Sequence, residues 1–233
     1  MYQNDYIMRQ IFMLTQWIRK QTEQHPDEET LQLESVRAEI GEWYRRFRIP
    51  PLGVWLTLSE RDGVRLLGPE GAELDADRCF AASLLLLEEA RRARSANNFQ
   101  IFEACVRRSL YSALMTWHIA PLDKLDSIGA REWIETILEG FWLEQGRVLD
   151  ELSLETRFEL VLYYEQLGHY DRSENILFTL AHESANRIDR LAEQWFSRMN
   201  DLSGPMLIEG GLSRHEVIDS ERSWTLLRSR IIN

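Results

Sequence analysis

Hydrophobic residues recur every three or four positions along most of the chain, which is the period of an amphipathic α-helix. In residues 5–20, for example, Ile7, Ile11, Leu14 and Ile18 are spaced four, three and four residues apart. A helix with this spacing has one apolar face. The pattern therefore predicts a first helix that packs on the rest of the protein along that face.

A second helix is predicted over about 29–47, and Pro50 and Pro51 end it. Residues 48–74 then lose the helical period and contain several glycines. Two short apolar runs, 54–58 and 64–67, flank an Asp-Gly pair, which favours a small β-hairpin. An irregular loop that places its apolar side chains on the helices is the alternative.

The helical period returns after residue 74. Residues 75–94 and 99–117 predict an antiparallel helical hairpin, and further helices are expected around 130–144, 154–166 and 170–181. Later helices are predicted over 186–199 and after a capping box that starts at Ser213. The expected divisions of the chain are an N-terminal helical pair, a Pro/Gly-rich connection, a helical-repeat body, and a loop with a C-terminal helix. These cover 1–48, 49–74, 75–202 and 203–233.

The segment 154–187 resembles a tetratricopeptide repeat. Gly168 occupies the turn position of the 34-residue unit, and the small Ser173 stands where the second helix approaches the first. Because one repeat cannot bury both of its faces, neighbouring helices must complete it. The resemblance implies an all-α fold of degenerate, tetratricopeptide-like antiparallel hairpins, that is, a short α-solenoid.

Two further segments resemble an uncharacterised bacterial family with tetratricopeptide-like helices. They are Asn-Asp-Tyr-Ile-Met-Arg-Gln-Ile at 4–11 and Arg-Ser-Glu-Asn-Ile-Leu-Phe at 172–178. The resemblance implies an all-helical protein and assigns it no activity.

Charge restricts the classes of partner. The 233 residues carry a formal net charge of −11, which opposes nonspecific binding to nucleic acids or anionic membranes. The two cysteines, Cys79 and Cys105, have neither metal-site nor disulfide-scaffold spacing, so they are expected to be small buried side chains. The N-terminus has no secretory pattern, and we expect a cytoplasmic protein.

Motifs of catalysis are missing from the sequence. Gly63 and Gly68 have the spacing of a phosphate-binding loop, but Pro69 replaces the lysine that would reach the phosphate. The zinc-protease, serine-hydrolase and dinucleotide motifs do not occur. We therefore predict no catalytic residue, no metal ligand and no cofactor, and we expect a protein that is not an enzyme.

Candidate partner-binding residues follow from the repeat resemblance. First-helix positions of such a hairpin line a groove, here acidic with an apolar floor, which would suit a basic or amphipathic peptide. The alternative is that a neighbouring helix buries Phe158 and Leu162. Two of the eight tryptophans are added as exposed anchors. The candidates are Glu155, Phe158, Leu162, Glu165, Gln166, Trp55 and Trp142.

Two functions are compatible with these patterns. The first is a protein-protein interaction module, including a homodimer formed through the Trp17/Ile18 stripe or the C-terminal helix. The alternative is a regulatory sensor that binds a small ligand or short peptide between helices, near Tyr163 and Trp133.

Overall fold

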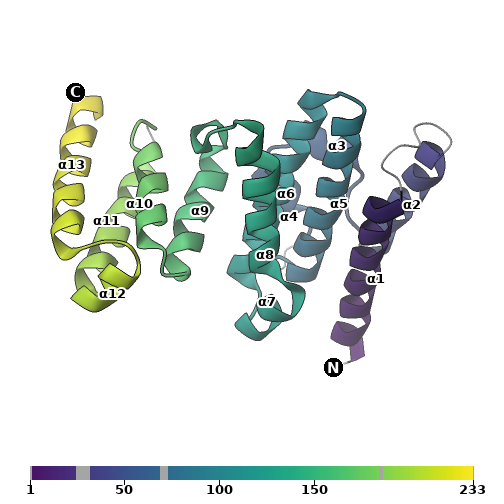
Figure 1. The fold of residues 1–233 in the computed structure, drawn as a ribbon, viewed down its shortest axis with the longest axis horizontal. Coiled ribbons are helices and arrows are strands. Elements are labelled where there is room, and N and C mark those ends of the chain that lie inside the picture. Colours follow the sequence, from purple (N-terminus) through teal and green to yellow (C-terminus); the bar gives the residue numbers. More distant parts are fainter. Residues whose placement is uncertain (1, 25–31, 69–72, 184–185, 233) are drawn as a thin grey trace. The chain divides into compact units, whose positions relative to one another are not determined.

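A computed structural model describes residues 2–24, 32–68, 73–183 and 186–232. In these ranges the chain forms thirteen α-helices and no β-strand, so the fold is all-α (Figure 1). The chain divides into two compact units, residues 1–147 and 148–233. The boundary after Arg147 falls inside the range 75–202 given above for the helical-repeat body.

In its described residues the first unit contains eight α-helices, a π-helical segment and one short 3₁₀ turn. A second 3₁₀ turn begins the second unit. Their bounds are α1 Tyr2–Gln24, α2 Gln32–Arg46, α3 Leu52–Thr57, α4 Glu60–Arg65, α5 Ala76–Ser95, α6 Phe99–Ile119, α7 Leu122–Ile128, α8 Ala130–Glu135, the π-helical segment Thr136–Trp142, and the turns Leu143–Gln145 and Leu149–Glu151.

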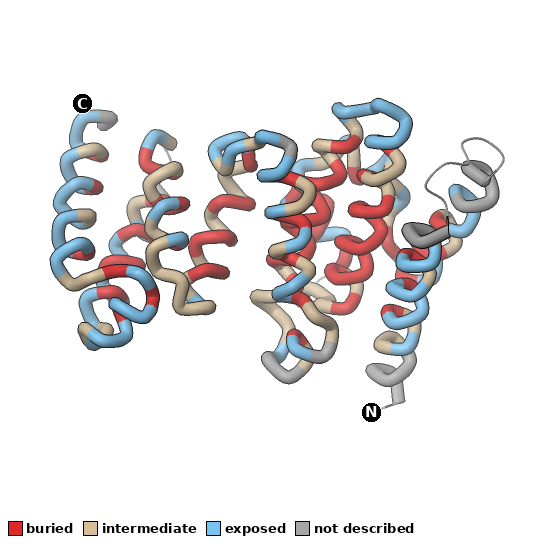
Figure 2. Tube along the Cα trace, viewed as in Figure 1, coloured by how far each residue is buried: buried red, intermediate tan, exposed pale blue. Residues whose placement is uncertain are grey.

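The antiparallel pair α5 and α6 forms the centre of the first unit (Figure 1). Buried positions concentrate on these two helices (Figure 2). Asp75 caps the start of α5, and Asn98 caps the start of α6 through the amide of Ile101 at 3.2 Å. The predicted hairpin is thus confirmed, and α1 packs against α5 through its apolar face.

The segment expected to be a β-hairpin or a loop instead folds as α3 and α4. Ser59 caps α4 by accepting a hydrogen bond from the amide of Asp62 at 3.1 Å, so the Asp-Gly pair lies inside a helix. The buried Arg108 of α6 donates to the carbonyls of Trp55 and Leu58, both at 2.7 Å. The carbonyl of Trp55 also accepts from the amide of Leu58 at 3.3 Å, whereas Leu58 lies just beyond the end of α3. The guanidinium thus ties the end of α3 to α6 and stabilises a helix too short to persist alone.

The described part of the second unit contains five α-helices. Their bounds are α9 Leu154–Gln166, α10 Tyr170–Thr179, α11 Asn186–Asp201, α12 Gly204–Glu209 and α13 Arg214–Ile232. Ser153 caps α9, because its side chain accepts a hydrogen bond from the amide of Thr156. Gly168, with φ of +75°, forms the turn between α9 and α10, a conformation that favours glycine.

Three helices of this unit meet at Ser173, a fully buried residue of α10. Its hydroxyl donates to the carbonyl of Val161 in α9 and accepts from the Nε1 of Trp195 in α11, both at 2.8 Å. The expected close approach of α10 to α9 at Ser173 is therefore confirmed. In the first unit, Trp133 Nε1 similarly donates to the hydroxyl of Ser83 at 2.8 Å.

The Gly210-Gly211 pair is tightly packed. The amide of Asp171 donates to the carbonyl of Gly210 at 3.1 Å. A Cβ at Gly210 would lie 2.1 Å from the ring of Tyr170 and 2.6 Å from the carbonyl oxygen of Gly168. The Gly210-Gly211 pair therefore packs directly against the turn between α9 and α10 and the start of α10.

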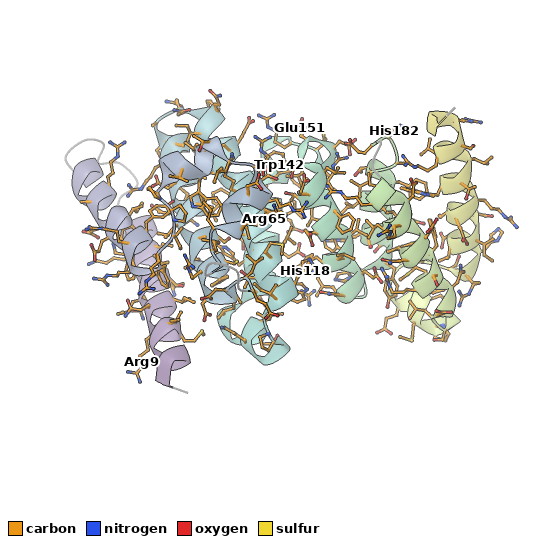
Figure 3. The ribbon with its side chains drawn as sticks, turned by 180° about the vertical axis from the view of Figure 1, so that it is seen from behind. Arg9, Arg65, His118, Trp142, Glu151 and His182 are labelled. Atoms are coloured by element: carbon orange, nitrogen blue, oxygen red, sulfur yellow. The ribbon has the colours of Figure 1, made fainter. Side chains whose placement is uncertain are left out.

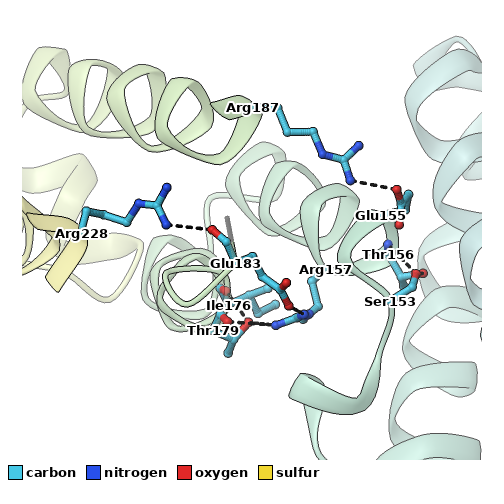
Figure 4. Close-up of polar contacts among 9 residues, drawn as sticks. All are labelled: Ser153, Glu155, Thr156, Arg157, Ile176, Thr179, Glu183, Arg187 and Arg228. Atoms are coloured by element: carbon cyan, nitrogen blue, oxygen red, sulfur yellow. Dashed lines mark hydrogen bonds and ion pairs between the residues drawn. The ribbon is translucent and has the colours of Figure 1, made fainter. Parts of the chain in front are cut away.

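Arginines fix the end of α10 from two sides (Figure 4). Arg157 of α9 donates to the carbonyl of Thr179 at 2.9 Å and pairs with Glu183 at 2.5 Å. Arg228 of α13 donates to the carbonyl of Glu183 at 2.8 Å and binds both carboxylate oxygens of Asp189. These contacts connect α9, α10, α11 and α13 through charge-assisted hydrogen bonds.

Candidate interaction surfaces

The outer face of α1 carries exposed apolar side chains. Ile11, Leu14 and Ile18 are buried on the inner face, whereas 62% of Phe12 and 41% of Met13 are exposed. A helix advances 100° per residue, so the residues within about 50° of the centre of the outer face form one stripe. We call this set the α1 stripe: Arg9, Phe12, Met13, Gln16 and Lys20.

The α1 stripe is basic although the chain is acidic. Among residues 7–20 the only charged side chains are Arg9, Arg19 and Lys20, and all three are exposed. Figure 3 shows Arg9 extending away from the helix. The stripe runs about 16 Å from Arg9 to Lys20 at 1.5 Å per residue. It thus presents two apolar anchors between cations.

The predicted groove residues of α9 lie along the neighbouring helix α11. Glu155 pairs with Arg187 at 2.9 Å, and the same guanidinium lies 5.8 Å from the centre of the Phe158 ring. Farther along, Glu165 accepts two hydrogen bonds from Arg198, which raises the pKa of that arginine. Residue numbers increase together in both pairs, so α9 and α11 run parallel.

We call this contact the α9–α11 seam. Leu162 is half-buried, and Gln166 is exposed. Glu155 and Phe158 contact Arg187, and Glu165 contacts Arg198, so all three side chains face α11. Arginines of α11 compensate two of the acids, so the seam is less acidic than the sequence of α9 alone indicates.

The structure corrects the prediction that two tryptophans are exposed anchors. Trp55 and Trp142 are each 1% exposed, so neither is an exposed anchor. Trp55 packs on Gly63, where a Cβ would lie 2.5 Å from the indole ring. Trp142 ends the π-helical segment, whose wider turn changes which face its residues occupy relative to a regular α-helix.

The side chains of the predicted N-terminal self-association stripe contact their own unit. Ile18 is 5% exposed, and Trp17 is half-buried with its Nε1 donating to Glu39 of α2. Both residues help to attach α1 to its own unit. Phe12, one position after the buried Ile11, is the exposed aromatic residue that this interpretation missed. Its signal was an apolar residue outside the repeating spacing of the buried face.

The C-terminal helix attaches through Val217 and Trp224, which are buried. The capping box at its start is confirmed, because Ser213 and Glu216 exchange backbone-to-side-chain hydrogen bonds at 2.6 and 3.2 Å. On the outer face, Ile218 and Leu226 are 36% and 62% exposed. Besides its buried inner face, this helix therefore exposes two apolar residues on its outer face, and the sequence analysis did not predict them.

Both cysteines are buried as expected. Burial raises the pKa of Cys79 and of Cys105 to about 12, so both thiols are protonated at neutral pH. A thiol in this state is a poor nucleophile.

Within the described ranges, no helix has both the length and the apolar character needed to cross a membrane. The same ranges contain no group of three or more His, Cys, Asp or Glu residues arranged to hold a metal ion.

A comparison with protein-family models identifies the family of the chain. The model of a family of unknown function, DUF6483, matches residues 1–224. The chain belongs to this family. This match agrees with the expectation, from the sequence, of membership in an uncharacterised family. No curated protein and no solved structure matches this DUF6483 chain.

Proposed function

We propose that this DUF6483 protein is a non-catalytic protein-interaction module that binds a helical segment of a partner along the α1 stripe. The observation that supports the proposal is the exposure of Phe12 and Met13 between cations on a helix with no acidic side chain among residues 7–20. Exposed apolar residues bordered by charge are typical of protein-protein contacts.

The chemistry of the stripe selects its partner. A helix that presents apolar residues three and four positions apart can place them against Phe12 and Met13. Acidic residues beside that apolar row would lie near Arg9 and Lys20 and would guide association. The proposed ligand is therefore an acidic amphipathic helix, and it differs from the basic peptide expected for a groove on α9.

The stripe is short, so the affinity should be modest. Truncating Phe12 to alanine should remove about 1.4 kcal/mol or more of binding free energy, which is at least about tenfold in Kd. Reversing the charge of Arg9 and Lys20 should weaken binding most at low salt, because exposed charges are screened beyond about 10 Å at 0.1 M salt.

Two synthetic helical peptides test this proposal with the full chain. Both carry one row of leucines, flanked by glutamates in one peptide and by lysines in the other. In fluorescence anisotropy titrations, the glutamate peptide should bind at least about tenfold more tightly. The variant Arg9→Glu/Lys20→Glu should lose this preference, and Arg61→Glu, which reverses an exposed charge on α4, should retain it.

Equal binding of the two peptides to the wild-type chain would overturn the proposal. Unchanged binding of the glutamate peptide to Arg9→Glu/Lys20→Glu would also overturn it. Circular dichroism of each variant confirms that the helices are intact.

The sensor alternative, a ligand site near Tyr163 and Trp133, stays a prediction. Trp133 belongs to the first unit and Tyr163 to the second. Trp133 also uses its Nε1 in the bond to Ser83.

A further inference from the structure

Methionine side chains differ sharply in exposure along the described chain. Met13 of α1 and Met206 of α12 are 41% and 48% exposed, whereas Met199 of α11 is 1% exposed. Met13 follows Phe12 on the outer face of α1, and these two residues are the apolar anchors of the α1 stripe. The stripe therefore presents a thioether that reagents in solution can reach.

A thioether reacts with hydroperoxides to give a sulfoxide. A lone pair of the sulfur attacks one peroxide oxygen, so an S–O bond forms and the O–O bond breaks. The proton of the transferred oxygen passes to the leaving oxygen, which departs as water or as an alcohol. The sulfur is oxidised and the peroxide is reduced, each by one electron pair. A sulfoxide reductase reverses the change with two thiols, which form a disulfide and release the oxygen as water.

We infer that Met13 is a redox modification site, and that its oxidation by a hydroperoxide prevents the α1 stripe from binding its helical partner. This inference rests on the proposed function of the stripe. A sulfoxide is polar, whereas the thioether is a flexible apolar group. Burying the sulfoxide oxygen against a row of leucines would leave it without a hydrogen bond, which is costly.

A neighbouring cation adds a second effect. Arg9 precedes Met13 by four residues, so the two side chains lie one turn apart on the same face of α1. Arg9 extends away from the helix (Figure 3). A sulfoxide oxygen at position 13 can accept a hydrogen bond from this guanidinium. The cation would then be directed along its own helix and away from an acidic residue of the partner.

Other oxidisable groups are buried or lie outside the stripe. Burial raises the pKa of Cys79 and of Cys105 to about 12. Both therefore lack, at neutral pH, the thiolate that peroxides attack. Met206 is as exposed as Met13 but belongs to the second unit. It is a matched reference for a thioether that reacts without changing the stripe.

Oxidation should weaken binding without unfolding α1. The outer face of the helix remains in water, and the buried Ile11, Leu14 and Ile18 still attach it to its unit. The Kd for the glutamate-flanked peptide should rise at least about fivefold, because one of two apolar anchors is lost. Circular dichroism of the oxidised chain should match that of the untreated chain.

Peroxide treatment of the full chain tests the modification itself. The chain is incubated with hydrogen peroxide, catalase removes the excess, and peptide mass spectrometry measures the sulfoxide at each methionine. Met13 and Met206 should oxidise much faster than the buried Met199, because susceptibility follows exposure. Oxidation of Met13 that is no faster than that of Met199 would overturn the inference, whatever the chain binds.

Matched variants connect the modification to binding. Met13→Leu keeps an apolar anchor of similar volume without a thioether, so peroxide should leave its affinity for the glutamate-flanked peptide unchanged. Met206→Leu should lose affinity after treatment as the wild-type chain does. Equal losses in the wild-type chain and in Met13→Leu would overturn the inference, and so would no loss in the wild-type chain.

The untreated chain separates this inference from the proposed function. If the untreated chain shows no preference for the glutamate-flanked peptide, the proposed function fails and the inference fails with it. If the preference is present and survives oxidation of Met13, only the inference fails. Methionine sulfoxide reductases, with dithiothreitol as the thiol source, should restore the affinity of the treated chain. Removal of the sulfoxide without recovery of binding would contradict the assignment to Met13.

Discussion

Replacing Ser173 by alanine tests how the three helices of the second unit are held together. The hydroxyl connects the carbonyl of Val161 to the indole N–H of Trp195, and Ser173 and Trp195 are both fully buried. Alanine leaves the indole N–H without this acceptor, at a cost of about 1 to 3 kcal/mol, and removes a further bond worth about 1 kcal/mol. We expect Ser173→Ala to destabilise the second unit by about 2 to 3 kcal/mol.

The measurement is urea unfolding of the full chain, followed by circular dichroism and by tryptophan fluorescence. Ser223→Ala is the matched control, because Ser223 is an exposed residue of α13 and the change has the same helix-propensity gain. Trp195→Phe combined with Ser173→Ala completes a double-mutant cycle, which should show a coupling of at least about 0.5 kcal/mol. If Ser173→Ala and Ser223→Ala have the same effect within about 0.5 kcal/mol, the reasoning is refuted.

Three further predictions concern close packing, helix capping and pH. Gly210→Ala should destabilise the chain by about 2 kcal/mol or more, measured by urea unfolding, because the added Cβ meets Tyr170 and a backbone carbonyl that cannot move aside; an unchanged midpoint would refute this packing. Arg108→Lys should lower the thermal midpoint, because an ammonium cannot reproduce the fork that reaches Trp55 and Leu58; a midpoint equal to wild type would contradict the capping role. Burial, together with Glu216 and Asp171, raises the pKa of Glu174, and its hydrogen bond with Ser220 opposes this rise. Because the folded-state pKa is raised, protonation of Glu174 stabilises the folded chain as the pH falls through that pKa. This stabilisation is absent at neutral pH. Glu174→Gln should therefore raise the thermal midpoint at pH 7, and its advantage over wild type should shrink toward pH 4; an advantage independent of pH would exclude this cause.

Periodicity and capping predicted the long helices well. The hairpin α5/α6, the Ser153 cap and the capping box at Ser213 depend on neighbouring residues in the chain, so local sequence specifies them. The close approach at Ser173 was predicted for the same reason, from a small residue at one position of a known repeat unit.

The segment 48–74 could not be predicted in this way. The end of its first short helix is held by Arg108, about fifty residues later in the chain, which donates to the carbonyls of Trp55 and Leu58. Turn residues such as the Asp-Gly pair carry no information about that distant donor. Tertiary contacts therefore overrode the local preference for a turn.

The candidate site was predicted only in part. The α9 residues do share a face, but the sequence of α9 does not show that Arg187 and Arg198 would compensate its acids. The sequence also could not show which tryptophans are exposed. Trp55, for example, packs against Gly63, eight residues later in the chain. Phe12 is exposed because α1 buries only one face on α5, and that choice of face becomes certain only when the unit is assembled.

Hydrogen exchange of the full chain, measured by mass spectrometry with and without the glutamate-flanked helical peptide, tests the central claim most directly. We predict that amides of residues 7–20 exchange more slowly when the peptide is present, and that those of the α9–α11 seam do not change. Slower exchange at α9 and α11 with no change in α1 would contradict the account.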